Sequence, residues 1–169
     1  MRARFDYIVL DTPALLETAD SRIIAHTADA VLLVVRPSIE RLGLQERVAF
    51  AGLLSDEQLA EYYRGAKMLL MPSLLEGFGL PIVEAMACGT PVVCANAASL
   101  PEIVEGAAWL VDPLSVADIA RGISRVLRDD DLRNSLRQRG LERAQHFDWD
   151  KTAATVWSVL QAAAASETR

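Results

Sequence analysis

The sequence predicts an α/β protein: a single Rossmann-like three-layer domain with a mostly parallel sheet between helices and a helical C-terminal segment. Short apolar runs rich in Val, Ile and Leu recur up to residue 111, mostly separated by helical patterns or turn residues. These runs are continuous rather than alternating, which is typical of strands covered on both faces. From Asp130 onward the pattern is only helical. The expected strands are 7–10, 30–35, 48–51, 68–71, 91–95 and 109–111.

Capping patterns mark the start of two helices. Ser55 and Gln58 have the spacing of a capping box, which predicts a helix over 56–64. Ser115, with Asp118 three residues further on, has the pattern of a second start. Apolar residues then recur on one stripe of that second helix, which we expect to face the sheet. The stripe consists of Ile119, Ile123, Val126 and Leu127.

The length and charge of the chain restrict its number of domains and its possible partners. A chain of 169 residues, 51% of them apolar, suffices for one domain with a packed core, which we place over 1–169. The net charge is −6 and Lys67 and Lys151 are the only lysines, so no nucleic-acid partner is expected. Four arginines gather in the segment 133–143, but acidic residues alternate with them, which favours a solvated helix face over a binding patch. They are Arg133, Arg137, Arg139 and Arg143.

Cysteine usage and hydropathy favour a cytoplasmic protein. Cys88 and Cys94 fit neither a disulfide framework nor a metal knuckle, so they are expected to be buried free thiols in a reducing compartment. No apolar run has the length of a membrane span, and the first residues continue directly into a strand-like segment. His26 and His146 stand in no motif and are interpreted as ordinary histidines. No metal or cofactor is expected.

The stretch EGFGLPIVEAMACGTP, residues 76–91, is the most informative segment. It follows the expected strand 68–71 and predicts a loop over 72–79, a helix over 81–87 with Pro81 at its first position, and Gly89 at its C-terminal cap. Loops at the carboxyl ends of parallel strands are where such sheets bind ligands. The free amides of a helix N-terminus there attract phosphate or sugar oxygens.

Two glutamates flank this turn. Glu76 lies in the expected loop and Glu84 one turn into the expected helix, so both can reach the same mouth and accept hydrogen bonds from ligand hydroxyls. Gly77 and Gly79 would let the backbone approach a ligand closely. The alternative is that both glutamates are solvated charges and that the glycines serve only the turn. The residues themselves specify no reaction.

EGFGLPIVEAMACGTPVV closely resembles the donor-site motif of family-4 GT-B glycosyltransferases, and the resemblance extends over about residues 39–162. It implies the nucleotide-sugar-binding, C-terminal half of a two-domain transferase that retains anomeric configuration and works without a metal. By this resemblance Glu76 holds donor-sugar hydroxyls, the backbone of Phe78, Gly79 and Leu80 approaches the sugar and diphosphate, and Glu84 binds the ribose. The implied transition state is oxocarbenium-like, and neither glutamate is assigned as a nucleophile.

Residues 5–36 resemble something else, the Walker B region of the P-loop ATPase domain of bacterial tyrosine autokinases. Asp11 would be the magnesium-organising residue, but the chain contains no GxxxxGK[ST], so Asp11 is interpreted as structural. We expect a seam near 37–45, with the segment 5–36 supplying sheet to the transferase-like part. The Arg and Lys that pair with the diphosphate in the resembled family have no equivalent here, and Arg36 is the one weak substitute.

We expect the acceptor-binding domain that the resemblance implies to be missing from this chain, because the residues before the match are too few to form one. The final helix crosses to that domain in the resembled family. Val156, Trp157 and Leu160 are therefore expected to form an exposed apolar patch that packs on the chain's own sheet or drives self-association. Three functions stay open: a nucleotide-sugar-binding transferase half, weak or inactive alone; an inert hybrid or scaffold; and an ATPase or autokinase remnant.

Overall fold

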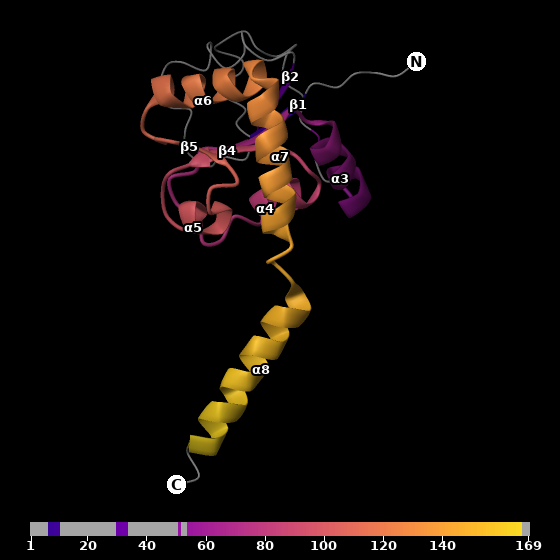
Figure 1. Cartoon of the computed structure of the whole chain (residues 1–169), viewed down its shortest axis with the longest axis vertical. Coiled ribbons are helices and arrows are strands. Elements are labelled where there is room, and N and C mark those ends of the chain that lie inside the picture. Colours follow the sequence, from indigo (N-terminus) through magenta and orange to yellow (C-terminus); the bar gives the residue numbers. More distant parts are fainter. Residues whose placement is uncertain (1–6, 11–29, 34–50, 52–53, 167–169) are drawn as a thin grey trace.

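The structure, a computed structural model, describes residues 7–10, 30–33, 51 and 54–166. Five parallel strands form one sheet in the order β2-β1-β3-β4-β5, with helices on both faces (Figure 1). The strands are β1 Tyr7–Leu10, β2 Ala30–Leu33, β3 Met68–Met71, β4 Val92–Ala95 and β5 Trp109–Val111. The helices are α3 Asp56–Gly65, α4 Leu80–Ala87, α5 Leu100–Val104, α6 Val116–Arg128, α7 Asp130–Ala144 and α8 Trp149–Ser166.

The predicted fold class is confirmed, and so are five of the expected strands at or within their limits. Of the sixth, 48–51, Ala51 is described and is not in a strand, while 48–50 lie outside the described residues. The expected seam at 37–45 lies outside them as well, as do Asp11, His26 and Arg36. Helix α5 was not predicted, because five residues are too few to display a helical period.

The N-terminal strands extend the sheet, as the sequence suggested. Strand β1 is parallel to β2 on one side, with Tyr7 opposite Ala30, and to β3 on the other, with Ile8 opposite Met68. Strand β1 thereby joins β2 to the rest of the sheet, and the backbone of β3 is paired on both sides.

The core has two faces because side chains alternate along each strand. Leu69, Met71, Val92 and Cys94 belong to the apolar cluster under α3, α4 and α5, and all four are buried. Burial raises the pKa of the Cys94 thiol to about 12, so this thiol stays protonated at neutral pH. On the other face lies α6. A Cβ on Gly122 would come within 2.6 Å of Val111 and 3.0 Å of Trp109, so this helix is pressed against β5.

The predicted caps are present. Ser55 Oγ accepts a hydrogen bond from the Gln58 N–H, and the Gln58 side chain accepts one from the Ser55 N–H, which completes the capping box at α3. Ser115 accepts a hydrogen bond from the Asp118 N–H at the start of α6. Asp118 in turn accepts a hydrogen bond from the Asp112 N–H, which lowers the pKa of the Asp118 carboxyl.

Helix α7 corrects the prediction of a solvated arginine face. Arg133 is half-buried and donates hydrogen bonds to the Val126 and Leu127 carbonyls at the end of α6. Arg143 is half-buried too and donates to the Ile103 and Glu102 carbonyls at the end of α5. The sequence shows how the charged residues are spaced along α7. It does not show that backbone carbonyls at the ends of α6 and α5 lie beside two of the arginines. Arg137 and Arg139 are exposed, as expected.

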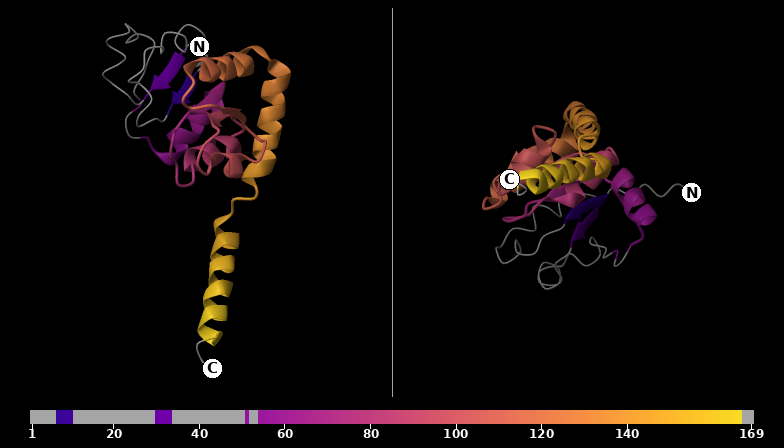
Figure 2. Two further views of the ribbon diagram at one scale, coloured as in Figure 1. Left: turned by 90° about the vertical axis from the view of Figure 1, so that its left-hand side faces the viewer. Right: turned by 90° about the horizontal axis from the view of Figure 1, so that it is seen from below.

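Helix α8 projects away from the body of the molecule (Figures 1 and 2). Val156, Trp157 and Leu160 are exposed by 52%, 63% and 57%, so the predicted exposed apolar patch is confirmed. The possibility that these residues pack on the chain's own sheet is wrong in this structure, because the connector after α7 leads α8 away from the sheet. Among the described helices, none has both the length and the hydropathy required to cross a membrane.

Candidate functional site

The loop between β3 and α4 lies at the carboxyl end of β3, where the sequence placed the candidate site. Gly79 is the N-cap of α4 and has left-handed backbone angles, φ 89° and ψ 47°. A Cβ at this position would lie 2.8 Å from Leu100 Cδ2. Glycine is therefore required at position 79 both by its conformation and by the close approach of α5. Around Gly77, by contrast, a Cβ would meet nothing within 4 Å.

This turn leaves backbone donors free. Within the described part of the chain, the N–H groups of Gly77, Phe78, Gly79 and Leu80 donate to no protein acceptor. Pro81 follows at the second helical position rather than the first, since α4 begins at Leu80. Free amides at a helix N-terminus, together with the positive end of the helix dipole, favour an anionic or oxygen-rich ligand.

Glu76 is half-buried in this loop, and its main chain is held in place. The Ser99 hydroxyl, at the N-terminus of α5, donates a 3.0 Å hydrogen bond to the Glu76 carbonyl oxygen. No hydrogen bond to another described residue engages the Glu76 carboxylate, so it can accept hydrogen bonds from a ligand. Ser99 thus fixes the backbone at position 76, while the Glu76 carboxylate stays available to a ligand.

Glu84 lies on the exposed side of α4, and α3 orients it. Its Oε2 accepts a hydrogen bond of 3.1 Å from the hydroxyl of Tyr63, a residue that is only 4% exposed. A buried tyrosine that donates to an exposed carboxylate restricts the positions of that carboxylate and leaves its other oxygen available. Simultaneous contact of Glu76 and Glu84 with one ligand stays a prediction.

Phe78 and Leu80 are exposed, by 43% and 49%, between the two glutamates. The Phe78 ring stands edge-on to Phe147, with 5.7 Å between ring centroids and an interplanar angle of 90°. Phe147 belongs to the connector between α7 and α8, so a residue far along the chain supports the loop.

Sequence reasoning missed several residues that shape this site. Ser73, two residues after β3, is 2% exposed, and its hydroxyl has no hydrogen-bond partner in the described structure. An unsatisfied buried hydroxyl costs on the order of 1–3 kcal/mol, so a water or ligand oxygen would stabilise it. Its position directly after a buried strand was the one available signal. Tyr63, Ser99 and Phe147 carried no signal, because they lie on elements distant in sequence.

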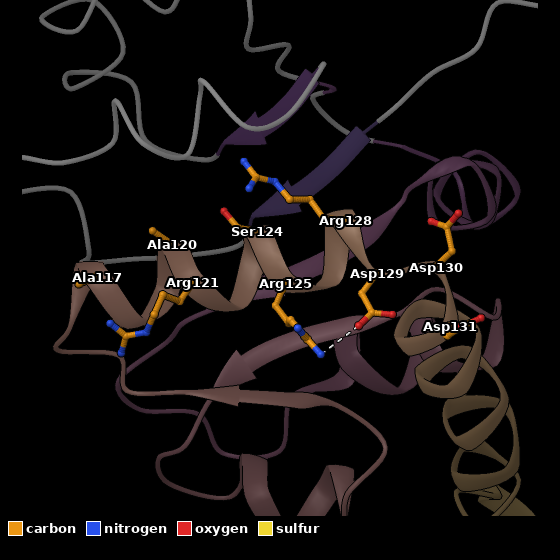
Figure 3. Close-up of a pocket in the computed structure, with 9 residues that line it drawn as sticks. All are labelled: Ala117, Ala120, Arg121, Ser124, Arg125, Arg128, Asp129, Asp130 and Asp131. Atoms are coloured by element: carbon orange, nitrogen blue, oxygen red, sulfur yellow. Dashed lines mark ion pairs between the residues drawn. The ribbon is translucent and has the colours of Figure 1, made fainter.

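A hollow runs along α6 to the start of α7 (Figure 3). Arg121 pairs with Asp118, and Arg125 pairs with Asp129, so local carboxylates balance much of the positive charge of the hollow. Neither Glu76 nor Glu84 lines it, and we assign it no role in the candidate site. Its lining residues are Ala117, Ala120, Arg121, Ser124, Arg125, Arg128, Asp129, Asp130 and Asp131.

A parallel sheet between helices, with a glycine-bearing loop at the start of α4, defines a Rossmann-like α/β class of fold. The profile of the family "Glycosyl transferases group 1" matches residues 33–143. The chain belongs to this family. O-antigen chain mannosyltransferase B of Escherichia coli is 43% identical over 112 residues, which are 66% of this chain and 29% of that protein.

Solved structures agree on the fold. Sucrose-phosphate synthase from Thermosynechococcus elongatus superposes with a TM-score of 0.78 at 28% identity, over 98% of this chain and 47% of that one. HepE of Anabaena, solved in complex with UDP and glucose, superposes with a TM-score of 0.79 at 23% identity, over 95% and 49%. This chain therefore has the fold of one part of a GT-B glycosyltransferase and spans less than half the length of these relatives.

Proposed function

We propose that this chain binds a nucleotide-sugar donor for retaining glycosyl transfer. The observation that carries the proposal is the row of free N–H groups from Gly77 to Leu80, bracketed by Glu76 and Glu84. A diphosphate needs donors and sugar hydroxyls need acceptors. The loop and the first turns of α4 present both within the nine residues 76–84. Membership of a glycosyltransferase family supports the same assignment.

Each candidate residue has a role in this proposal. Glu76 accepts hydrogen bonds from donor-sugar hydroxyls, the amides of Phe78, Gly79 and Leu80 receive the sugar and diphosphate oxygens, and Glu84 accepts from the ribose. Stabilisation of the departing diphosphate by fixed donors is the contribution expected for an oxocarbenium-like transition state. No residue is assigned as a nucleophile, and the reaction is proposed to need neither a metal nor a cofactor.

Transfer itself is proposed to require a separate acceptor-binding domain, so that the chain alone is weak or inactive. The matched region is 29% of the Escherichia coli mannosyltransferase, which is in keeping with this view. The Walker B-like resemblance of residues 5–36, the seam at 37–45 and a cytoplasmic location stay predictions of the sequence. Strands β1 and β2 support the interpretation of 5–36 as sheet-forming sequence.

Calorimetric titration with UDP-glucose, GDP-mannose and ADP-glucose tests the donor site. At least one should bind the parent chain, and Glu76→Ala and Glu84→Ala should each weaken binding by about tenfold or more, since hydrogen bonds to charged groups are lost. Glu61→Ala, which removes an exposed carboxylate of α3, is the matched control and should bind like the parent. Absence of binding to all three compounds, or equal affinity in all variants, would favour the inert hybrid.

A further inference from the structure

Helix α5 supports the candidate loop at two points. At its N-terminus the Ser99 hydroxyl donates to the Glu76 carbonyl oxygen over 3.0 Å. The next residue, Leu100, is fully buried and lies so close to Gly79 that a Cβ there would be 2.8 Å from its Cδ2. Any displacement of α5 would therefore move the backbone at positions 76 and 79.

Arg143 of α7 holds the other end of this short helix. Its Nε donates to the Ile103 carbonyl over 2.8 Å, and its Nη2 donates to the Glu102 carbonyl over 3.0 Å. Its Nη1 pairs with the Glu105 carboxylate at the C-cap. A five-residue helix has few internal hydrogen bonds, so a guanidinium that satisfies its last carbonyls contributes a large share of its stability.

The same guanidinium reaches the loop by a second route. Arg143 Cζ lies 5.0 Å from the centroid of the Phe147 ring, which is a cation–π contact. The Phe147 ring then meets Phe78 edge-on at 5.7 Å. The side chain of Arg143 is only 19% exposed, so these contacts are shielded from water and restrict its position.

We propose that Arg143 is a positioning residue for the loop 76–80. It acts on Glu76 and Gly79 through α5, and on Phe78 through Phe147, without contacting the ligand itself. The loop must present four free amides in one arrangement, and among the described residues no acceptor holds these amides. Contacts with α5 and Phe147 therefore restrict the backbone of the loop, which its own hydrogen bonds do not do. The effect of Arg143 on nucleotide-sugar affinity rests on the function proposed above; its effect on loop order does not.

Backbone ¹⁵N relaxation of the full chain without nucleotide tests the loop directly. Order parameters for residues 76–80 should be near the rigid value of about 0.85 in the parent and fall toward about 0.6 in Arg143→Ala. Arg143→Lys keeps the charge but loses the planar fork, so it should restore part of the order. Titration with UDP-glucose, GDP-mannose and ADP-glucose should show about a tenfold loss of affinity for Arg143→Ala.

Arg139→Ala is the matched control. It removes an arginine of the same helix that donates to the Gly106 carbonyl over 2.6 Å and for which no aromatic contact is found in the described structure. It should leave the order parameters of residues 76–80 near the parent's value of about 0.85 and the affinity within about twofold of the parent, because it is linked to the loop by neither route. Equal loop order in Arg143→Ala and Arg139→Ala would overturn the proposal.

Two further outcomes are distinguishable. If the parent binds none of the three nucleotide sugars, the proposed function fails, while the order parameters still decide the role of Arg143. If Arg143→Ala does not fold, Phe147→Leu removes only the aromatic route. Lower order at Phe78 in that variant would support the aromatic route, and unchanged order there would overturn it. Lower order at Glu76 and Gly79 in Arg143→Lys than in Arg139→Ala would support the route through α5, and equal order would overturn it.

Discussion

Helices α7 and α8 are consecutive and similar in length, yet their environments are opposite. Helix α7 is rich in charged residues, but Leu136 is buried and Gly140 lies against Met86 of α4. Helix α8 is far more apolar, but residues 151–164 are all exposed. The difference teaches that burial depends on the presence of a complementary surface. The apolar content of each helix did not predict whether that helix is buried or exposed.

The largest effect should come from matched leucine truncations in the two helices. Leu136→Ala should lower the free energy of unfolding by about 2–5 kcal/mol, because it opens a cavity between α7 and the body. Leu160→Ala in α8 should change it by no more than about 0.5 kcal/mol, since the side chain is already exposed. Urea denaturation followed by circular dichroism measures both. Equal losses would mean that α8 packs against the body in solution.

A smaller effect on stability is expected from removing one positively charged side chain in each of the two helices. Arg133→Ala should cost about 1.5–3 kcal/mol, because the Val126 and Leu127 carbonyls lose a charged donor. Lys151→Ala should cost about 0–1 kcal/mol, because its 3.9 Å contact with Asp148 is solvent-exposed. Thermal unfolding of both variants beside the parent provides the measurement. If Arg133→Ala is as stable as the parent, Arg133 belongs to the solvated helix face that the sequence predicted.

The smallest effect on stability should come from charges placed on α8. Val156→Glu with Leu160→Glu should leave the melting temperature within about 2 °C of the parent, because both side chains are exposed. The sequence predicts self-association through the apolar patch of α8, and this prediction implies less self-association in this variant. Sedimentation velocity over a range of concentrations compares the two proteins. A parent that stays monomeric at high concentration would contradict self-association through α8.

The sequence predicted the scaffold of the candidate site well. The strand before the loop and the start of α4 to within one residue follow from local patterns of apolar residues and proline. The sequence named Gly77 and Gly79 together, and only the structure showed that Gly79 has a left-handed conformation. The supports of the loop did not follow from such patterns. Ser99 is 23 residues from Glu76, and Tyr63 is 21 residues from Glu84, and one sequence shows no pairing over such distances.

The sequence by itself determined the parallel α/β architecture, the capped helices, the loop that carries Glu76 and the helix that carries Glu84. These features depend on backbone conformations and apolar periods that neighbouring residues set. Only the tertiary structure decided that Arg133 and Arg143 satisfy helix ends, that Phe147 meets Phe78 and that α8 extends from the body. Each of those depends on which surfaces meet in space, and charge or hydropathy along a chain does not specify that.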